Sequence, residues 1–333
     1  MPVAHQFEAY FLRLNRVLDE VDARFGEALD LSQLAATANF EPVHFHKVFL
    51  ACLGETPAAY VRRIRLERAA ARLMNKRAAI LDVALDAGFG SGEAFARAFR
   101  LRFGHSPSAW QAGGHASFRL SGMQHHQAWQ NPAQPLFPSS PWLPDADASQ
   151  RSFALVDGFP LGLEGFGPDS SGFTVRVLAP QRIAYIRCRG AYGAHVRVLW
   201  SRLIALLGAS DFLAGKCELI ARWPDNPSIT HAALCRHEVG VVLQPGESVP
   251  GCLNQRTIPG GLHLVCPFDG QSDEIHRLWR WIFAVWLPRN GLCVANALSF
   301  ERFPIADNPG LFSPVINRIA GELCVPVAEI GKP

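Results

Sequence analysis

The sequence lacks the patterns that mark metal-binding and membrane proteins. Its eight cysteines are scattered, with no CxxC pair and no histidine pair at a metal-ligating spacing. Buried, reduced thiols are therefore favoured over a metal centre or a disulfide framework. No apolar run approaches the ~18 residues that a membrane-spanning helix needs, and no signal-peptide-like stretch opens the chain. These absences predict a soluble, cytoplasmic protein that needs no metal or other cofactor.

A strong net charge is also missing. The formal charge is only +3 over 333 residues, which by itself is weak support for a nucleic-acid partner. Locally the balance differs, because residues 41–112 hold eleven Lys and Arg against six Asp and Glu. Such a basic stretch is consistent with phosphate contacts. At this length two domains are expected, and a hydrophobic content of 49% supports well-formed cores.

Residues 31–110 contain one pattern twice. Each copy predicts a short apolar helix, a tight turn at Asn39 or Gly88, and a second helix closed by a glycine and a proline. The offset between the copies is 49 residues before the turn and 50 after it. This is a helix-turn-helix pattern in tandem. The matched pairs are Leu34/Val83, Ala35/Ala84, Phe40/Phe89, Phe45/Phe95, Phe49/Phe99, Gly54/Gly104, Pro57/Pro107 and Tyr60/Trp110.

Helices are also expected before and between the two units. Residues 7–25 have apolar positions at helical spacing and predict a leading helix that packs on the first unit. Residues 58–74 carry apolar positions among five arginines and predict one long connecting helix. A rigid connector would fix the distance and angle between the second helices of the two units. Its arginines are expected to be partly phosphate-facing and partly solvated.

A different composition begins at residue 113. Residues 113–172 are rich in Gly, Ser, His, Gln and Pro, and proline recurs at every third position from 132 to 144. Three residues is the period of a polyproline II helix, so these prolines would share one edge of an extended segment. A semi-rigid linker is favoured over a ligand for a proline-binding module.

The second half also repeats itself. A strand, a glycine and an amphipathic helix with a Leu-Trp pair recur about 79 residues apart, at 183–204 and at 262–283. Further strands are expected at 217–222, 230–243 and 294–303. The pattern predicts an α+β domain of two pseudo-symmetric strand-helix-strand halves with a cleft between them.

The first half resembles the DNA-binding domain of the AraC/XylS family of bacterial transcription regulators. The resemblance covers residues 8–112, within an all-α domain expected at 1–112. Trp110 and Gln111 depart from the usual Tyr-Arg, which we interpret as a local packing change. The signature residues in the second unit are Ile80, Val83-Ala84, Gly88-Phe89, Phe95-Ala-Arg97-Ala-Phe99 and Phe103-Gly104-His-Ser-Pro107.

The last part of the chain, residues 173–330, resembles the GyrI-like effector-binding domain. A DNA reader followed by a ligand domain is the order in one recognised subset of AraC-type regulators. Residues 230–233 read Thr-His-Ala-Ala and depart from the Arg-Tyr-Asp-like segment that is usual there. The matching residues are Ile183-Ala-Tyr185-Ile186, Gly190-Ala-Tyr192, Ile258-Pro-Gly-Gly261, Trp286-Leu-Pro288, Gly291, Glu301-Arg-Phe303 and Cys324-Val-Pro326-Val.

The first resemblance implies that the second helix of each unit enters the major groove of double-stranded DNA. Lys47 and Arg97 can donate to guanine, Glu93 can accept from cytosine, and Val43 and Ala94 can contact a thymine methyl group. A solvated surface side chain is the alternative for each. The phenylalanines of these helices recur at i, i+4 and are expected in the core. The implied reading positions are Val43, His46, Lys47, Gly92, Glu93, Ala94, Ala96 and Arg97.

In the second domain Glu301 is the residue of most interest, because it stands beside Phe300 and Phe303 on an expected strand. Burying an unpaired carboxylate is costly. The resemblance implies that this glutamate lies at the base of an aromatic cleft and meets a small, cationic, lipophilic effector, which aromatic faces also attract. The alternative is a pair with Arg302 or another surface arginine. The implied effector residues are Glu301, Tyr185, Tyr192, Trp223, Trp286 and Phe303.

Together these features predict a one-component, sequence-specific transcription regulator and not an enzyme. Its expected partners are double-stranded DNA, a small-molecule effector and, in one mode of regulation, RNA polymerase. One alternative is that the GyrI-like domain acts as a small-molecule hydrolase with Glu301 as general base, helped by Tyr185, or as a sequestering protein. Another is a DNA-organising protein whose second domain binds a protein. No coiled-coil repeat points to a dimer.

Overall fold

A computed structural model describes residues 2–118, 166–190, 194–207, 217–226, 228–271, 274–295, 297–308 and 318–329, with only the backbone described at 2–8, 194–197, 232 and 276. Contacts divide the chain into two compact units. The helical unit comprises Met1–Pro141 and Asp225–Leu234, and the sheet unit comprises Trp142–Pro224 and Cys235–Pro333. Most of the expected linker, including its proline repeat, lies outside the described residues. No described helix is long and apolar enough to cross a membrane.

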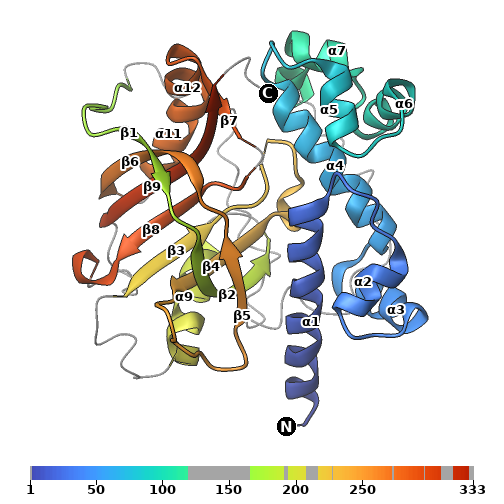
Figure 1. The fold of residues 1–333 in the computed structure, drawn as a ribbon, viewed down its shortest axis with the longest axis vertical. Helices are drawn as coiled ribbons and strands as arrows, with labels where there is room; N and C mark the ends of the chain where they lie inside the picture. Colours follow the sequence, from blue (N-terminus) through green and yellow to red (C-terminus); the bar gives the residue numbers. More distant parts are fainter. Residues whose placement is uncertain are drawn as a thin grey trace. The chain divides into compact units, whose positions relative to one another are not determined.

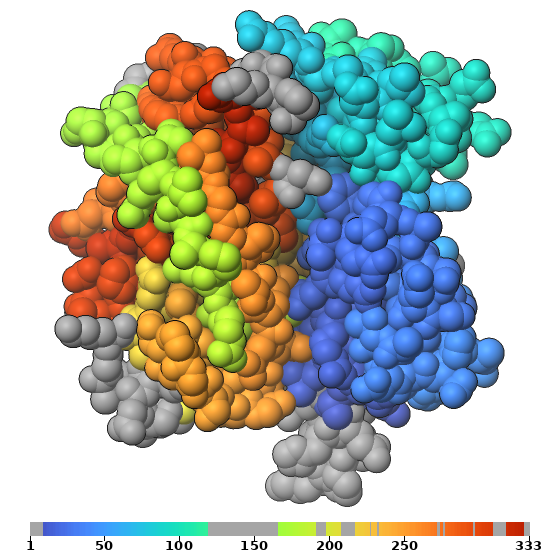
Figure 2. All heavy atoms as spheres, viewed as in Figure 1, coloured from blue at the N-terminus to red at the C-terminus, as the bar shows by residue number. Residues whose placement is uncertain are grey.

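The helical unit contains the predicted leading helix, two helix-turn-helix units and the connecting helix (Figure 1). The connector α4 spans nearly the range that the sequence predicts. Figure 2 shows the atoms of residues 9–118 coloured from blue to cyan-green along the chain. The helices are α1 (Pro2–Arg24), α2 (Leu31–Thr37), α3 (Pro42–Leu53), α4 (Pro57–Leu73), α5 (Ile80–Asp86), α6 (Gly92–Phe103), α7 (Pro107–Ala109) and the π-helical turn η1 (Trp110–Gly114).

Local chemistry explains where these helices begin and turn. Asp30 forms a capping box with Gln33 at the start of α2, and the Ser91 hydroxyl accepts from the Ala94 amide at the start of α6. The turn between the helices of each unit has one residue in the left-handed region, Asn39 (φ 51°) and Gly88 (φ 77°). These are the two residue types that adopt this conformation most readily. The predicted turns are confirmed at both positions.

The sheet unit is an α+β domain built around one antiparallel sheet. The strand order is β1-β6-β9-β8-β3-β4-β2-β5, and β7 pairs with β9. Helices α9 (Ala194–Leu207) and α11 (Glu274–Trp281) belong to this unit, with the π-helical η4 (Ile282–Trp286) and α12 (Leu287–Arg289). The strands are β1 (Thr174–Leu178), β2 (Gln181–Arg189), β3 (Glu218–Arg222), β4 (Arg236–Val242), β5 (Asn254–Ile258), β6 (Gly261–Gln271), β7 (Leu292–Val294), β8 (Phe300–Pro304) and β9 (Arg318–Glu329). Short 3-10 turns are η3 (Ala232–Leu234) and η5 (Ile305–Asp307).

The predicted pseudo-symmetry is present in the strand order. The half β1-β2-α9-β3-β4 corresponds to the half β5-β6-α11-β8-β9, and exchanging the two halves reverses the order of the sheet. Each half lends its first strand to the other, since β1 pairs with β6 and β5 pairs with β2. The sequence repeat at 183–204 and 262–283 is therefore a structural repeat.

Two expected strands begin later than the sequence predicts. In the stretch expected at 294–303, β7 ends at Val294 and β8 starts only at Phe300. Residues 230–243 were expected to be extended, but β4 starts at Arg236 and Ala232–Leu234 form a 3-10 turn. The reason is that Ile229 is buried in the apolar core of the second helix-turn-helix unit, and Thr230 hydrogen-bonds to Glu67 of α4. Segment 225–234 thus packs in the helical unit and does not extend strand β4 of the sheet.

Opposite faces of the sheet have different cores. One face packs against residues of α9 and α11 and carries Ala184, Ile186, Val239, Ala221 and Leu323. The other carries Ile183, Tyr185, Ile220, Phe300 and Cys324. Because side chains alternate along a strand, register assigns each site residue to one of these faces.

Candidate DNA-reading surface and effector site

Helices α3 and α6 present the expected reading positions to solvent. Val43 is 71% exposed, and Lys47, Glu93 and Arg97 are also exposed, while the remaining positions are half-buried. Within the described residues, the charged side chains of Lys47, Glu93 and Arg97 form no hydrogen bond or ion pair. They are therefore available to donate to or accept from an external partner. The half-buried positions are His46, Gly92, Ala94 and Ala96.

The opposite sides of these helices form the core. The four phenylalanines predicted to be buried have at most 1% of their surface exposed, and they pack edge-to-face in pairs along α3 and α6. Trp110 is buried beside Phe99, and its indole N–H donates to the carbonyl of Ala70 at 3.0 Å. Gln111 donates to the carbonyls of Asn75 and Ala78. Trp110 and Gln111, which depart from the family signature, thus form hydrogen bonds with nearby carbonyls and represent an alternative packing of the same region.

Most arginines of the connector α4 form hydrogen bonds or ion pairs within the protein. Arg63 is buried between Glu55 and Glu67, Arg68 pairs with Asp22 at 3.0 Å, and Arg72 pairs with Asp86 at 2.8 Å. Arg65 donates to three backbone carbonyls, those of Phe25, Glu27 and Gly88. The positive charge of the connector is therefore largely structural. Arg62 differs, because it is exposed and forms no hydrogen bond or ion pair within the described residues.

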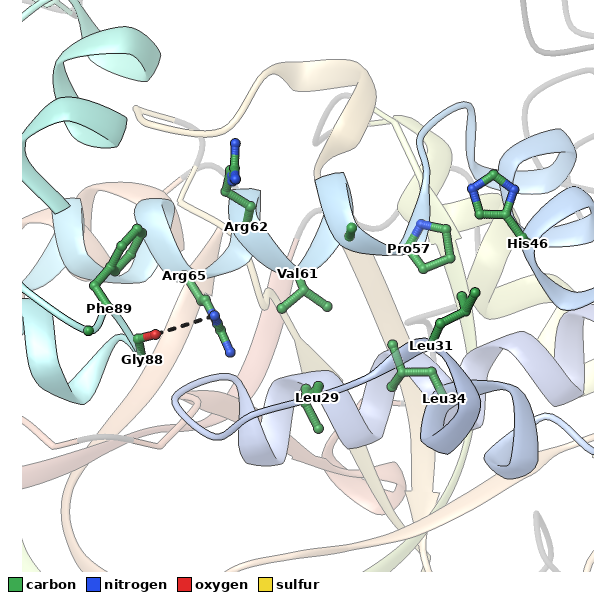
Figure 3. Close-up of a pocket in the computed structure, with 12 residues that line it drawn as sticks. Leu29, Leu31, Leu34, His46, Pro57, Val61, Arg62, Arg65, Gly88 and Phe89 are labelled. Carbon is green, nitrogen blue, oxygen red and sulfur yellow. Dashed lines mark hydrogen bonds between the residues drawn. The ribbon is translucent and has the colours of Figure 1, made fainter. Parts of the chain in front are cut away.

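A hollow of about 440 Å³ lies against α4 between the two helix-turn-helix units. Figure 3 shows Val61 on α4, Leu34 on α2, His46 of α3 at one end and Phe89 at the other. Arg62 and Arg65 both line it. The hollow is thus bordered by one reading helix and by the segment that leads into the other.

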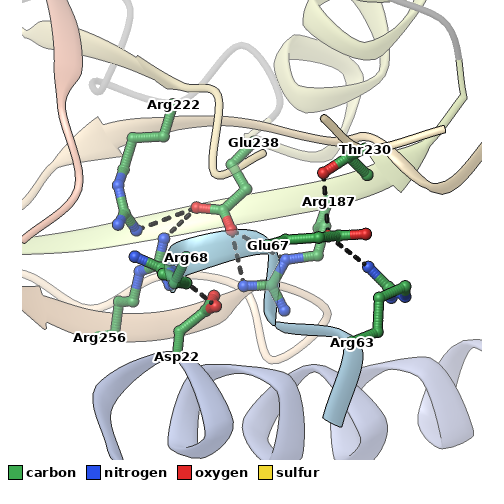
Figure 4. Close-up of polar contacts among 9 residues, drawn as sticks. All are labelled: Asp22, Arg63, Glu67, Arg68, Arg187, Arg222, Thr230, Glu238 and Arg256. Carbon is green, nitrogen blue, oxygen red and sulfur yellow. Dashed lines mark hydrogen bonds and ion pairs between the residues drawn. The ribbon is translucent and has the colours of Figure 1, made fainter. Parts of the chain in front are cut away.

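Glu67 links three parts of the helical unit. Its carboxylate accepts from Arg63 of the same helix at 3.0 Å, and the Thr230 hydroxyl donates to it at 2.9 Å (Figure 4). Arg102 of α6 also donates to it, at 2.6 Å. Burial by itself would lower the pKa of Arg63, but the carboxylates of Glu67 and Glu55 outweigh this and the pKa is raised above its ordinary value. Arg63 is therefore a permanent cation in this network.

In the sheet unit, Glu238 of β4 is the centre of a second charged cluster, also shown in Figure 4. Only 1% of this side chain is exposed. Its carboxylate accepts from Arg187 of β2 at 2.7 Å, from Arg222 of β3 at 3.1 Å, and from Arg256 of β5. The guanidinium groups of Arg187 and Arg256 also lie over the ring of Tyr185. This arrangement joins four strands and supplies more than enough positive charge for one buried carboxylate.

Glu301 of β8 has a different environment. Its side chain is 3% exposed, and the Trp279 indole N–H of α11 donates to the carboxylate at 2.6 Å. The indole of Trp223 donates a second hydrogen bond. Within the described residues Glu301 makes no ion pair. The sequence offered Arg302 as a possible partner of Glu301, but Arg302 pairs with Glu322 and Glu218. The reason is that neighbouring residues of a strand point to opposite faces.

Burial raises the pKa of Glu301 from its ordinary 4.5 to about 7, and the hydrogen bonds from Trp279 and Trp223 only partly oppose this rise. A carboxyl in an apolar environment resists ionisation, because the charged form loses its hydration. A bound cation would stabilise the ionised form and so would be favoured at this position.

The structure brings some of the expected effector residues together and separates others. Trp223 and Phe303 lie on the α9 and α11 side of the sheet with Glu301, and Trp286 packs against the same core. Tyr185 lies on the other face, because Glu301 aligns through Ala221 and Val239 with Ile186, the neighbour of Tyr185. Tyr192 lies outside the described residues. Tyr185 is therefore not part of the Glu301 site.

Sequence reasoning missed Trp279 as the residue that contacts Glu301 directly. A signal was present, because the internal repeat places Trp200 of α9 and Trp279 of α11 at equivalent positions. The Trp200 ring lies 6.4 Å from that of Phe303, on the same face of the sheet as Glu301. Both pseudo-symmetric helices thus place a tryptophan on this face of the sheet, and that of α11 contacts the carboxylate.

Each half of the chain matches a known protein domain. A helix-turn-helix domain matches residues 34–113, and a GyrI-like small-molecule-binding domain matches residues 173–327. The HTH-type transcriptional regulator Rv1931c of Mycobacterium tuberculosis is 38% identical over 88 residues, which is 26% of this chain and 34% of that protein. The chain thus spans about a third of the length of that relative.

Two further proteins resemble the helical half. The probable transcription factor PqrA of Proteus vulgaris is 32% identical over 95 residues, covering 28% of this chain and 78% of PqrA. The crystal structure of the DNA-binding domain of AdpA, a global transcriptional factor, in complex with a target DNA is 28% identical, with a TM-score of 0.30, covering 31% of this chain and 94% of that one. From the PqrA match and the two domain matches, the chain belongs to the AraC-type family of helix-turn-helix transcription regulators and carries a GyrI-like small-molecule-binding domain.

Proposed function

We propose that the protein is a one-component regulator of transcription that binds a specific DNA sequence in the cytoplasm. The observation that carries this proposal is the pair of helices α3 and α6, which are held by one connector. They carry exposed polar side chains that form no hydrogen bond or ion pair within the described residues. Two such helices in one chain can enter two adjacent segments of the major groove. A monomer would then suffice for binding, with RNA polymerase as a further partner.

The effector is proposed to be small, cationic and lipophilic, and to bind beside Glu301. A buried carboxylate that is held by two indole N–H groups and makes no ion pair within the described residues favours a ligand that brings positive charge. The tryptophan rings around it would attract the same cation, each by about 0.5–2 kcal/mol when desolvated. Regulation requires that the effector bind two states of the protein with different affinity. Segment 225–234 supports a connection between effector binding and the helical unit. It begins two residues after Trp223 in the chain and packs in the helical unit.

The DNA-binding proposal is tested by fluorescence anisotropy with the full-length protein and its own upstream intergenic DNA at two salt concentrations. Tight, sequence-selective and salt-dependent binding is the expected result. Arg97→Ala should lose about 1–3 kcal/mol at one base position and relax selectivity there. Weak binding that is indifferent to sequence would contradict the regulator. Uniform weakening of Arg97→Ala on every sequence would assign Arg97 to a phosphate instead.

Hydrolysis of a bound small molecule is a second candidate, which the raised pKa of Glu301 favours. A general base works best when its pKa lies near the working pH, and the pKa of Glu301 is about 7. Incubation of the protein with a panel of reactive esters and epoxides, followed by product analysis, separates the two functions. Product formation that Glu301→Gln abolishes would establish the enzyme, and unchanged ligand would favour the regulator.

A further inference from the structure

The five arginines of α4 fall into two groups. Arg63, Arg65, Arg68 and Arg72 each donate to a carboxylate or a carbonyl of the protein. Arg62 alone among these five is exposed and forms no hydrogen bond or ion pair in the described part of the chain. An uncommitted arginine on an otherwise internally paired helix is available for an external anion.

The place of Arg62 indicates which anion this is. It lines the hollow of about 440 Å³ between the two helix-turn-helix units, together with His46 of α3 and with Gly90, two residues before the start of α6. In Figure 3 its side chain leaves α4 on the side opposite Val61 and extends into the open. A DNA duplex that offers two adjacent segments of its major groove to α3 and α6 must pass its intervening backbone across the space between them. The side chain bordering that space then meets phosphates rather than base edges.

We propose that this hollow is a binding site for the DNA backbone between the two major-groove segments, with Arg62 as its phosphate ligand. The inference rests on the proposed DNA-binding function and adds a contact to it. The contact carries no sequence information, because every nucleotide presents the same phosphate. It sets the register of the two reading helices on the duplex.

The framework around the hollow is suited to hold a phosphate in a fixed position. Arg65 donates to the carbonyls of Phe25 and Glu27 at 2.6 and 2.5 Å and to that of Gly88 at 3.4 Å, so it joins the end of α1 to the turn of the second unit. The same turn approaches Gly26 so closely that a Cβ at Gly88 would lie 2.6 Å from the Gly26 carbonyl oxygen. A preformed site of this kind loses little conformational entropy on binding.

The test uses a duplex selected from a random library by the full-length protein, and a scrambled duplex of the same length. Arg62→Ala should weaken binding about tenfold on both duplexes at low salt. It should also reduce the slope of log K against log salt concentration by about 0.9, the value for one lost phosphate contact. Arg62→Lys should keep the slope of the native protein, since it keeps the charge.

Arg72→Ala is the matched control, because it removes the same charge from the same helix at a side chain that is already paired with Asp86. It should leave affinity and slope close to those of the native protein. A slope for Arg62→Ala equal to that of the control would overturn the phosphate site, as would a loss confined to the selected duplex. Failure of the native protein to distinguish the two duplexes would instead contradict sequence-specific regulation, while the slopes on the scrambled duplex would still decide the role of Arg62.

Discussion

Two buried carboxylates of the sheet unit have opposite electrostatic environments. Glu238 lies among three arginines from three strands. Glu301 lies beside two tryptophans, and in the described part of the chain it receives their indole hydrogen bonds and makes no ion pair. Both side chains are almost inaccessible, at 1% and 3% exposure. Burial alone therefore does not distinguish them. The difference lies in the compensating charge that the protein supplies to one and not to the other.

This contrast separates a structural carboxylate from a candidate ligand-binding one. A buried ion pair with complete hydrogen bonding holds strands in register, and removing one partner leaves buried charge behind. A buried carboxyl without a nearby cation has a raised pKa, and a counter-charge beside it stabilises its ionised form. Glu238 matches the first description and Glu301 the second. Substituting each glutamate by glutamine should therefore have opposite effects on stability.

The largest expected effect is that of Glu238→Gln. The substitution removes the carboxylate that Arg187, Arg222 and Arg256 share, and the free energy of unfolding should fall by about 3–5 kcal/mol. Urea unfolding followed by tryptophan fluorescence at pH 8 measures the loss. Under the same conditions Glu301→Gln should be as stable as the native protein or more stable. A comparable loss in both variants would remove the distinction between the two sites.

A second, smaller effect is the pH dependence that Glu301 contributes. Its folded pKa of about 7 lies above its ordinary 4.5, so the folded state binds the proton more tightly than the unfolded state. The contribution to stability is full below about pH 4.5 and is lost as the pH rises through 7. Between pH 5 and pH 8 the native protein should lose about 2–3 kcal/mol relative to Glu301→Gln. Parallel stability profiles for the two proteins would contradict the raised pKa.

The smallest effect is expected at the hydrogen bond that Trp279 donates. Trp279→Phe keeps an aromatic ring but removes the indole N–H that stabilises the ionised carboxylate. The pKa of Glu301 should rise further above 7, and stability at pH 8 should fall by about 1–2 kcal/mol, with a smaller loss at pH 5. Urea unfolding at both values measures the difference. An equal loss at both would mean that only packing had changed.

The helices of residues 2–109 in the helical unit could be predicted from the sequence, whereas the place of segment 225–234 in this unit could not. Its core positions follow from local spacing, because phenylalanines at i, i+4 on α3 and α6 share one side of a helix. Asn39 and Gly88 marked the turns for the same local reason. The role of each connector arginine was not predictable, since Asp22 and Asp86, which bind Arg68 and Arg72, are separated from them by 46 and 14 residues.

In the sheet unit, features that depend on strand pairing could not be predicted from the sequence. The repeat predicted two halves, and the apolar neighbours of Glu301 predicted a buried carboxylate. Tyr185 was grouped with Glu301 on the family resemblance, but its face depends on the register of three successive strand pairings, and a shift of one residue in any of them would reverse it. The cluster around Glu238 combines residues from four strands and is visible only after those pairings are known.

Glu301 is proposed to bind a cationic ligand through its carboxylate. A pair of ligands that differ only in charge tests this binding most directly. Benzyltrimethylammonium and its uncharged carbon isostere neopentylbenzene have the same shape and differ in charge. Calorimetric titration of the full-length protein at pH 8 should show that the cation binds at least tenfold more tightly than the isostere, and that Glu301→Gln abolishes this preference. Equal affinity for the two compounds, or a preference that survives Glu301→Gln, would contradict the account.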